Sequence, residues 1–248
     1  MLFISWNING LTKRYDEVKL LADAYAPDIL CLQKVRCGAG RERFTVDGYR
    51  QLFTQHDFGD WSGVTIYVRT DAGITPRRVV TPDLSLDGHL QVYDCNSFAL
   101  LNSYVPFANQ QLSGAVAYRQ KWDIAYRSFV KTLSQSSPVI ICGDLNVVHT
   151  EFDCCERRLE STRANFTAWE RGNFNRLLSD CDLADPYRTL HPAERKATYY
   201  GAWRHLQTGN RIDYFLISRS LLPRVSGAEI LSDFGTGQSV PISLDITL

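Results

Sequence analysis

Short hydrophobic runs separated by polar turns recur along the chain of 248 residues. Runs such as 29–33 and 139–143 are almost entirely apolar, as strands are when both of their faces are buried. The last seven residues alternate strictly between apolar and polar positions, which predicts a strand with one buried face. The segments that we expect to form strands are 2–6, 29–33, 63–69, 87–94, 97–105, 139–144, 211–218 and 241–248.

Two longer segments, about residues 12–25 and 112–133, repeat apolar residues at the spacing that is typical of an amphipathic helix. A third helix is marked by its start, because Thr167 can serve as the N-cap and Glu170, three residues on, completes a capping box. This helix should continue to about Leu178. Because strands and helices alternate along the chain, the pattern predicts an α/β fold.

No low-complexity segment, Gly/Ser-rich linker, long charge run or internal repeat divides the sequence, so we expect one domain over residues 1–248. Hydrophobic residues make up 44% of the chain, which is enough for a substantial core. The 27 Lys and Arg residues equal the 27 Asp and Glu residues in number. A formal net charge of zero argues against binding to nucleic acid through the overall field, although a local basic face is compatible with it.

The N-terminal residues enter a predicted strand without the pattern of a signal peptide, and no apolar stretch approaches the roughly 18 residues that span a bilayer. The seven cysteines include no C-x-x-C pair. Cys31 and Cys142 lie in apolar runs, where a thiol usually acts as a small buried hydrophobic group. We therefore expect an intracellular protein, of the cytoplasm or the nucleus, that does not bind membranes.

Polar residues follow several predicted strands, and α/β folds place their sites at such strand ends. The most informative are Asp144 and Asn146, which follow the apolar run 139–143. A carboxylate and an amide two residues apart can position a water molecule and bond a phosphate oxygen, but the same pair can also simply cap a turn. The other polar residues near strand ends are Asn7, Asn9, Lys34, Tyr104, His149, Asp213, Gln238 and Ser239.

Eight short motifs, taken in order, resemble a known family. They are SWNING, DILCLQ, SGV, YVP, YRQKWD, GDLNVVH, RIDYFLIS and PISLDI. Together they resemble the exonuclease III/apurinic (AP) endonuclease family of the endonuclease/exonuclease/phosphatase superfamily, over essentially the whole chain. The resemblance implies a four-layer α/β sandwich, with two face-to-face mixed β-sheets flanked by helices. It also implies a Mg²⁺-dependent phosphodiesterase that cuts beside an abasic site.

The resemblance assigns roles to five residues that match the family pattern. Asn7 would hold the carboxylate of the metal site or a phosphate oxygen, and Tyr104 would contact the scissile phosphate. Asp144 would orient the attacking water, and Asn146 would stabilise the charge of the phosphorane. Asp213 would lie beside the catalytic histidine and fix its tautomer.

Other positions depart from the family pattern. Lys34 stands where the family has the glutamate that is its principal metal ligand, and Gln238 and Ser239 stand where it has an aspartate and the catalytic histidine. Phe107 replaces a phosphate-contacting amide, and Asn210 replaces the tryptophan of the abasic pocket. The loop ANQQLSG, at 108–114, lacks the arginines that usually enter the DNA.

The positive charge of Lys34 bears on whether Mg²⁺ can bind at this site. An ammonium group about 4 Å from a divalent ion would repel it by roughly 8 kcal/mol at an effective dielectric constant near 20. Mg²⁺ also binds through oxygen ligands that are missing here, so we expect the Mg²⁺ site to be lost and no cofactor to be bound. Lys34 would fill the place of the metal and pair with Asp144 or Asp213, which would otherwise be uncompensated carboxylates. In the alternative, Lys34 extends into solvent and pairs with nothing.

Three functions remain open. The first, which we favour, is a binding or regulatory protein that has lost phosphodiesterase activity and takes DNA or RNA, weakly, or a protein partner in the former active-site cleft. The second is a weakly active or metal-independent AP endonuclease or 3′–5′ exonuclease of DNA repair, with His149, His205 or Glu151 as relocated groups. The third is a structural subunit of a larger assembly.

Overall fold

The computed structural model describes residues 1–37, 44–52, 63–79, 81, 89–155, 162–201 and 208–248, and the strands in these ranges form two six-stranded sheets. The first sheet has the order β11 (Val225–Ile230), β12 (Ile242–Ile246), β1 (Leu2–Asn7), β2 (Ile29–Gln33), β4 (Val64–Arg69) and β3 (Tyr49–Leu52). The second has the order β5 (Arg77–Arg78), β6 (Leu90–Asp94), β7 (Ala99–Tyr104), β8 (Val139–Asp144), β10 (Asp213–Ser218) and β9 (Leu183–Ala184). Both sheets are mixed, because β1 runs parallel to β2 and β7 runs parallel to β8 among antiparallel neighbours.

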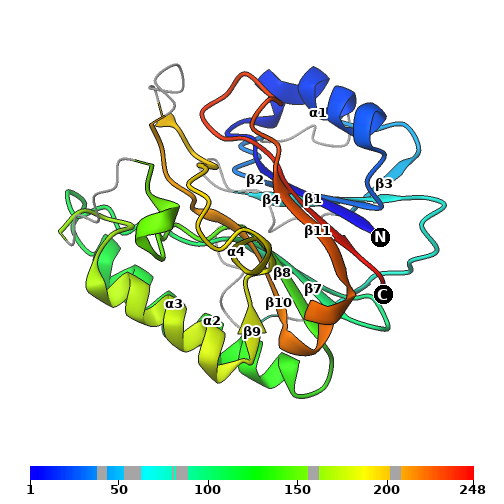
Figure 1. Cartoon of the computed structure of the whole chain (residues 1–248). Coiled ribbons are helices and arrows are strands. Elements are labelled where there is room, and N and C mark those ends of the chain that lie inside the picture. Colours follow the sequence, from blue (N-terminus) through cyan, green and yellow to red (C-terminus); the bar gives the residue numbers. More distant parts are fainter. Residues whose placement is uncertain (38–43, 53–62, 80, 82–88, 156–161, 202–207) are drawn as a thin grey trace.

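The two sheets pack face to face, and their inner faces share one hydrophobic core (Figure 1). Phe3 and Ile29 reach this core from the first sheet, and Leu100 and Ile140 reach it from the second. Helix α1 (Leu11–Tyr25) covers the outer face of the first sheet, and α2 (Ala115–Ser134) and α3 (Ala168–Asp180) cover the outer face of the second. The predicted four-layer α/β sandwich is therefore confirmed.

The three predicted helices are present. Helix α1 begins at Leu11, and α2 begins at Ala115 rather than at residue 112, directly after Gly114, whose φ of 81° is left-handed. The predicted capping box at the start of α3 is confirmed, because the Thr167 hydroxyl accepts from the Glu170 N–H while the Glu170 carboxylate accepts from the Thr167 N–H.

Differences from the prediction are confined to short elements and to element ends. The predicted strand at 87–94 is observed from Leu90, while residues 87 and 88 lie outside the described residues. The strand predicted at 211–218 begins at Asp213. The elements that the pattern did not predict are β3, β5, β9, β11, α4 (Pro186–Leu190) and the 3₁₀ helices Glu151–Asp153 and Arg219–Arg224. Each has six residues or fewer, and β3, β5 and β11 lack the apolar runs that marked the predicted strands of similar length.

All seven cysteines are free thiols. Cys31 and Cys142 are buried in the core between the sheets, as expected. A search of the described helices finds none that is both long enough and apolar enough to cross a membrane.

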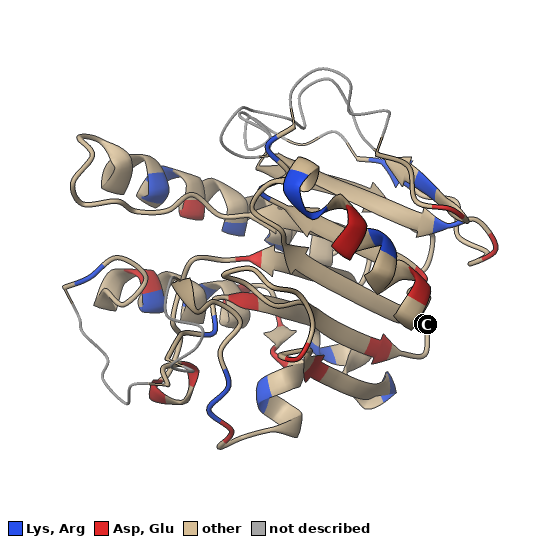
Figure 2. Ribbon diagram, turned by 90° about the horizontal axis from the view of Figure 1, so that it is seen from above, with Lys and Arg blue, Asp and Glu red and all other residues tan. Residues whose placement is uncertain are grey.

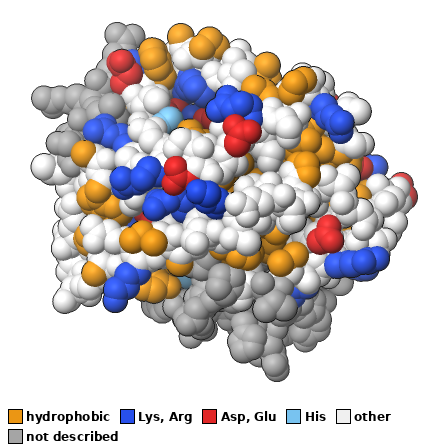
Figure 3. Space-filling model, turned by 90° about the horizontal axis from the view of Figure 1, so that it is seen from below, with side chains coloured by type: hydrophobic (Ala, Val, Ile, Leu, Met, Phe, Trp, Pro, Cys, Tyr) orange, Lys and Arg blue, Asp and Glu red, His pale blue; other side chains and the backbone are white. Residues whose placement is uncertain are grey.

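Charged side chains lie mainly on helices, loops and strand ends, while the interior strands carry few of them along their length (Figure 2). On the face seen from below, Lys and Arg side chains gather near the middle, with Asp and Glu side chains between them (Figure 3). The balanced net charge is therefore not spread evenly, but this face does not present charge of a single sign.

Candidate functional site

The register of the two sheets brings several strand ends to one edge of the sandwich. Asn7 ends β1, and Lys34 follows the last residue of its parallel neighbour β2. Tyr104 and Asp144 are paired at the ends of the parallel strands β7 and β8. Asp213 starts β10, which is antiparallel to β8, and is paired with Asp144. The five residues therefore gather at the edge where the sequence placed the candidate site.

Asp144 is the centre of this cluster and is fully buried. Its Oδ2 accepts a hydrogen bond from Asn7 Nδ2 at 2.8 Å and lies 3.1 Å from Lys34 Nζ. Its Oδ1 accepts from the backbone N–H of Asn146 at 3.0 Å. The predicted ion pair between Lys34 and Asp144 is thus present, and the alternative of a solvent-extended Lys34 is wrong, because only 16% of its side chain is exposed.

The backbone holds Lys34 in an unusual conformation. Its φ of 52° lies in the left-handed region, which costs a residue with a Cβ roughly 1–2 kcal/mol. The loop after β1 supports this conformation, because the Gly10 N–H donates to the Lys34 carbonyl at 2.8 Å and the Leu11 N–H donates to the Val35 carbonyl at 2.8 Å. The direction of the ammonium group toward Asp144 is therefore fixed by the surrounding structure.

Two opposing effects act on the pKa of Lys34. Burial favours the neutral amine and lowers the pKa, whereas the negative charge of Asp144 raises it. The second effect, with smaller contributions from Tyr104 and Asp213, leaves the pKa above its usual value. The Tyr104 ring adds a cation–π contact, with its centroid 4.8 Å from Nζ. Lys34 is consequently a permanent cation at neutral pH.

Asp213 has a different environment from Asp144, although it is buried beside it. Its carboxyl is fully buried, and the Thr198 side chain and the charge of Lys34 act to lower its pKa. Its backbone N–H donates to Thr198 Oγ1 at 3.0 Å, which fixes the start of β10. Burial and the charge of Asp144 raise the pKa of Asp213 to about 8, so its carboxyl is mostly neutral at pH 7.

His89 belongs to the same cluster and was not singled out from the sequence. It precedes β6, its ring stacks on Tyr104 with centroids 5.0 Å apart, and its Nδ1 lies 2.6 Å from the Tyr104 carbonyl oxygen. Its position inside the strand predicted at 87–94 gave no signal of this contact, which depends on the register of β6 against β7.

The amide of Asn146 is partly engaged within the protein. Its Nδ2 donates to the Val105 carbonyl at 2.7 Å, and its φ of 47° is left-handed, a conformation that asparagine tolerates. One N–H of the amide is thereby used to hold the loop after β7. Asn146 also lines the cleft described below.

Gly143, which precedes Asp144, allows β8 to lie unusually close to β7. Its φ of 127° is outside the range of residues with a side chain, and a Cβ there would lie 1.9 Å from the Ser103 carbonyl oxygen. Only glycine lets β8 approach β7 at this point.

Gln238 and Ser239 lie beside Asn7 but contact neither Asp144 nor Asp213 through any hydrogen bond described for them. Their backbone is tied to neighbouring segments, since Trp6 Nε1 donates to the Ser239 carbonyl at 3.2 Å and the Tyr200 N–H donates to the Gln238 carbonyl at 2.7 Å. Both line a second cavity of about 260 Å³ with Asn7.

A cleft of about 590 Å³ opens above the cluster. Its walls combine three kinds of side chain. The cations are Lys34, Arg36 and Arg163, the aromatic residues are Tyr104, Phe107, Phe166 and Tyr199, and the amides are Asn109, Gln110, Gln111, Asn146, Asn165 and Asn210. Phe107 and Asn210, two of the departures from the family pattern, therefore both face the cleft.

The relocated catalytic groups proposed from the sequence are not brought to the cluster. His149 Nε2 lies 2.6 Å from Asn175 Oδ1, on α3, and Glu151 pairs with Arg195 at 3.0 Å. His205 lies outside the described residues. Across the parts of the chain that the structure describes, no group of three or more His, Cys, Asp or Glu side chains is arranged to hold a metal ion.

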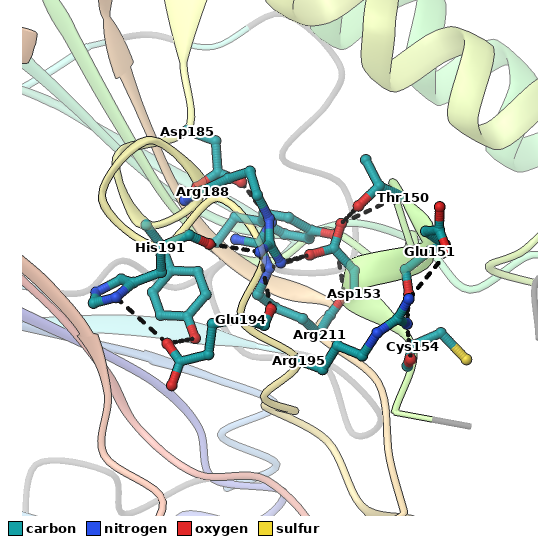
Figure 4. Close-up of polar contacts among 12 residues, drawn as sticks. Thr150, Glu151, Asp153, Cys154, Asp185, Arg188, His191, Glu194, Arg195 and Arg211 are labelled. Carbon is teal, nitrogen blue, oxygen red and sulfur yellow. Dashed lines mark hydrogen bonds and ion pairs between the residues drawn. The ribbon is translucent and has the colours of Figure 1, made fainter. Parts of the chain in front are cut away.

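A buried ionic network supports the start of β10 (Figure 4). Arg211, only 1% exposed, donates from Nε to Asp153 at 2.7 Å and from an Nη to Asp185 at 2.6 Å. Arg188 donates to the same oxygen of Asp153 at 2.6 Å. Burial alone would raise the pKa of Asp153, but the adjacent guanidinium groups lower it to about 2. The network joins the loop after β8 to the segment that delivers Asp213, and the sequence analysis did not identify it.

Comparison with known proteins gives one family. A sequence model described as the Endonuclease/Exonuclease/phosphatase family matches residues 4–235. An exodeoxyribonuclease of Bacillus subtilis is 28% identical over 255 residues, covering 100% of both chains. The DNA repair nuclease APEX1 of Danio rerio is 29% identical, covering 98% of this chain and 81% of its own.

Solved structures have the same fold. An AP endonuclease from Leishmania major superposes with a TM-score of 0.87 at 22% identity, covering 98% of this chain and 86% of its own. The 3′–5′ exonuclease NExo from Neisseria meningitidis superposes with a TM-score of 0.86 at 21% identity, covering 100% of both chains. At these identities the superpositions establish the architecture.

Proposed function

This chain belongs to the endonuclease/exonuclease/phosphatase family, and on that premise we propose that it is an exonuclease III-like protein whose cleft binds a phosphodiester group through Lys34, without a divalent metal ion and without hydrolysing it. The observation that carries the proposal is the ion pair of 3.1 Å between Lys34 and the buried Asp144. It places a permanent positive charge where the family pattern has a metal-binding glutamate.

The donors at this position do not fit Mg²⁺. A divalent ion about 4 Å from the Lys34 ammonium would be repelled by roughly 8 kcal/mol at an effective dielectric constant near 20. Asp144 Oδ2 already accepts from Asn7 and contacts Lys34, and Asp144 Oδ1 accepts from Asn146. Mg²⁺ needs several oxygen ligands in octahedral geometry, so the carboxylate that is present would have to give up its partners to bind one.

Neither carboxyl group of the cluster is suited to activating water. Both oxygens of Asp144 are engaged, and Asp213, with a pKa raised to about 8, is mostly protonated at pH 7. Ser239 stands at the position of the family's histidine, and loss of a general acid or base typically costs 10²- to 10⁴-fold in rate. These features support binding without hydrolysis.

A nucleic acid is the ligand that fits the cations of the cleft. The relatives are named an exodeoxyribonuclease and a DNA repair nuclease, and NExo of Neisseria has been solved with a product DNA hairpin. Lys34, Arg36 and Arg163 line one cleft, where a phosphate group would meet positive charge and hydrogen-bond donors.

The other functions have less support. Metal-independent hydrolysis needs a base near the phosphate, and His149 and Glu151 are held elsewhere by Asn175 and Arg195. A purely structural role would not explain why three cations line one cleft.

The proposal is tested on a duplex that contains a stable abasic-site analogue. Cleavage is followed with Mg²⁺ and with EDTA, and binding in EDTA is followed by fluorescence anisotropy. We expect no cleavage under either condition and metal-free binding that weakens at least about tenfold in Lys34→Gln, because charge on the phosphate contributes most of such binding.

Lys121→Gln is the matched control, because Lys121 is exposed on α2 and does not line the cleft. It should bind as the wild type does, and thermal melting shows whether both variants are folded. Mg²⁺-dependent cleavage by the wild type would overturn the proposal, as would binding that is unaffected by Lys34→Gln.

A further inference from the structure

We propose that the cleft takes an unpaired nucleotide of a single-stranded nucleic acid, with the phosphate at Lys34 and the base against Phe107 and the neighbouring amide side chains. This inference rests on the proposed function and names the ligand of the same site. The inference is based on the residues of the cleft wall that lie outside the cluster at the strand ends.

Phe107 is the first observation. Phe107 lines the cleft and is 43% exposed, although hydrogen bonds hold its loop. The Asn109 N–H donates to the Phe107 carbonyl at 2.9 Å, and Asn109 Oδ1 accepts from the Gln111 N–H at 3.0 Å. An aromatic ring exposed on an ordered loop offers a face for stacking, and every nucleobase has a face that can stack on it.

The amides are the second observation. Gln110 Nε2 donates to the Thr162 carbonyl at 2.5 Å, which ties the Phe107 loop to the segment that carries Asn165. Asn165 Oδ1 is buried and accepts no hydrogen bond from a described residue, and Asn165 and Asn210 both line the cleft. Amide side chains that line a cleft can donate to and accept from the edges of an unpaired base.

A double-stranded nucleic acid would make few contacts with Phe107 and with the amide side chains of the cleft. A paired base has both of its faces stacked in the duplex, so Phe107 could not stack on it, and sequence-specific contacts to aromatic and amide groups are typical of unpaired bases. An abasic sugar has no base to offer the amides. The loop at 108–114 also carries no charged residue to contact the second strand of a duplex.

The size of the cleft agrees with a nucleotide. Its volume of about 590 Å³ lies within the range of roughly 300–1,000 Å³ that is usual for small-molecule sites. Lys34 and Tyr104 lie at its floor, at the strand ends, while Phe107 and Asn109 stand on the loop that follows β7. A phosphate and its base can therefore be held by different parts of one cleft.

The test compares fluorescently labelled strands of one sequence, all in EDTA. They are single-stranded DNA, single-stranded RNA, intact duplex DNA, duplex DNA with an abasic-site analogue, and a single strand in which the sugars lack bases. We expect the DNA or RNA single strand, or both, to bind at least about tenfold more tightly than either duplex and than the strand without bases.

Two variants of the same loop sharpen the test. Phe107→Ala should weaken single-strand binding about tenfold, which is within the usual effect of removing one stacking ring. Leu112→Ala is the matched control, since Leu112 is 61% exposed on the same loop and does not line the cleft, so binding should stay unchanged. Thermal melting of both variants checks that each is folded.

The outcomes separate this inference from the function on which it rests. If a duplex binds as tightly as the single strands, or if the strand without bases binds equally well, the unpaired-nucleotide ligand is refuted while metal-free phosphodiester binding stands. Equal binding by wild type and Phe107→Ala also refutes it. If no strand binds even at low salt, both proposals fail.

Discussion

Asp213 lies directly opposite Asp144 on neighbouring antiparallel strands, yet Lys34 forms its ion pair with Asp144, which also accepts hydrogen bonds from Asn7 and Asn146. Burial and the charge of Asp144 raise the pKa of Asp213 to about 8, although Thr198 and Lys34 act in the opposite direction. Asp213 therefore keeps its proton to a higher pH than an ordinary aspartate does.

The first prediction concerns the pH dependence of stability. An unfolded aspartate loses its proton near pH 3.9, whereas folded Asp213 keeps it to about pH 8. Between these values the native state binds a proton that the unfolded state has released, so the free energy of unfolding falls as pH rises. Asp213→Asn removes this titration, and urea denaturation across the window should show a flatter profile for the variant than for the wild type.

Asp182→Asn serves as the control, because the Asp182 side chain is 79% exposed and its substitution should leave the slope of the wild type in place. Parallel profiles for wild type and Asp213→Asn would mean that Asp213 is ionised at neutral pH.

The second prediction concerns the metal. Lys34→Glu places a third carboxyl group beside Asp144 and Asp213, so the variant should melt at a lower temperature than the wild type in EDTA. Millimolar Mg²⁺ should recover part of this loss, because an oxygen ligand replaces the ammonium, and it should leave the wild type unchanged. Lys34→Gln, which is neutral, should be destabilised without responding to Mg²⁺. Stabilisation of the wild type by Mg²⁺, with an indifferent Glu variant, would contradict the replacement of the metal by Lys34.

The third prediction concerns the reactivity of Lys34. A lysine attacks the aldehyde of an abasic site only as the neutral amine, and Asp144 holds the pKa of Lys34 above its usual value despite burial. The neutral fraction at pH 7.4 is then below about 10⁻³. Incubation with abasic single-stranded DNA and sodium borohydride should give no cross-link that depends on Lys34. A cross-link that disappears in Lys34→Ala would show that the amine is available.

The fourth prediction concerns the network in Figure 4. Arg211→Met leaves Asp153 and Asp185 buried without their shared cation, and breaking a buried pair in this way typically costs about 3–5 kcal/mol. The pKa of Asp153, now about 2, should rise toward the value of an unfolded aspartate, so the variant lacks the stability that this carboxylate gives the wild type above that value. The difference in unfolding free energy between wild type and variant should therefore narrow as the solution is acidified toward pH 2. Arg219→Met, which removes an exposed pair with Asp182, should cost less than about 1 kcal/mol. Equal losses in urea denaturation of the two variants would contradict this.

Much of the site could be predicted because it follows from strand ends. The apolar runs before Lys34 and Asp144 identify buried strands, and parallel neighbours end at the same edge of a sheet, which puts Lys34 near Asn7 in the first sheet and Asp144 beside Tyr104 in the second. The two edges meet because the sheets pack face to face. The ion pair between Lys34 and Asp144 then follows from their opposite charges.

The remaining contacts depend on chain crossings that no local pattern encodes. Thr198 reaches Asp213 from an irregular segment, and Arg211 joins Asp153 and Asp185 from two different loops. His89 meets Tyr104 across two strands, and only the register reveals it. A two-residue strand such as β9 is too short to show an alternating sequence pattern, and it is recognised only by its pairing with β10 in the folded chain.

Gly143 limits where this site can change. A side chain there would collide with the Ser103 carbonyl, and Asp144 directly follows Gly143 on β8 and is paired with Asp213 on β10. The departures from the family pattern lie instead on loops, at Lys34, Gln238 and Ser239. For protein engineering, the strands that carry Asp144 and Asp213 should therefore be left unchanged. New metal ligands or nucleophiles can instead be introduced by substitution in the loops that carry Lys34, Gln238 and Ser239.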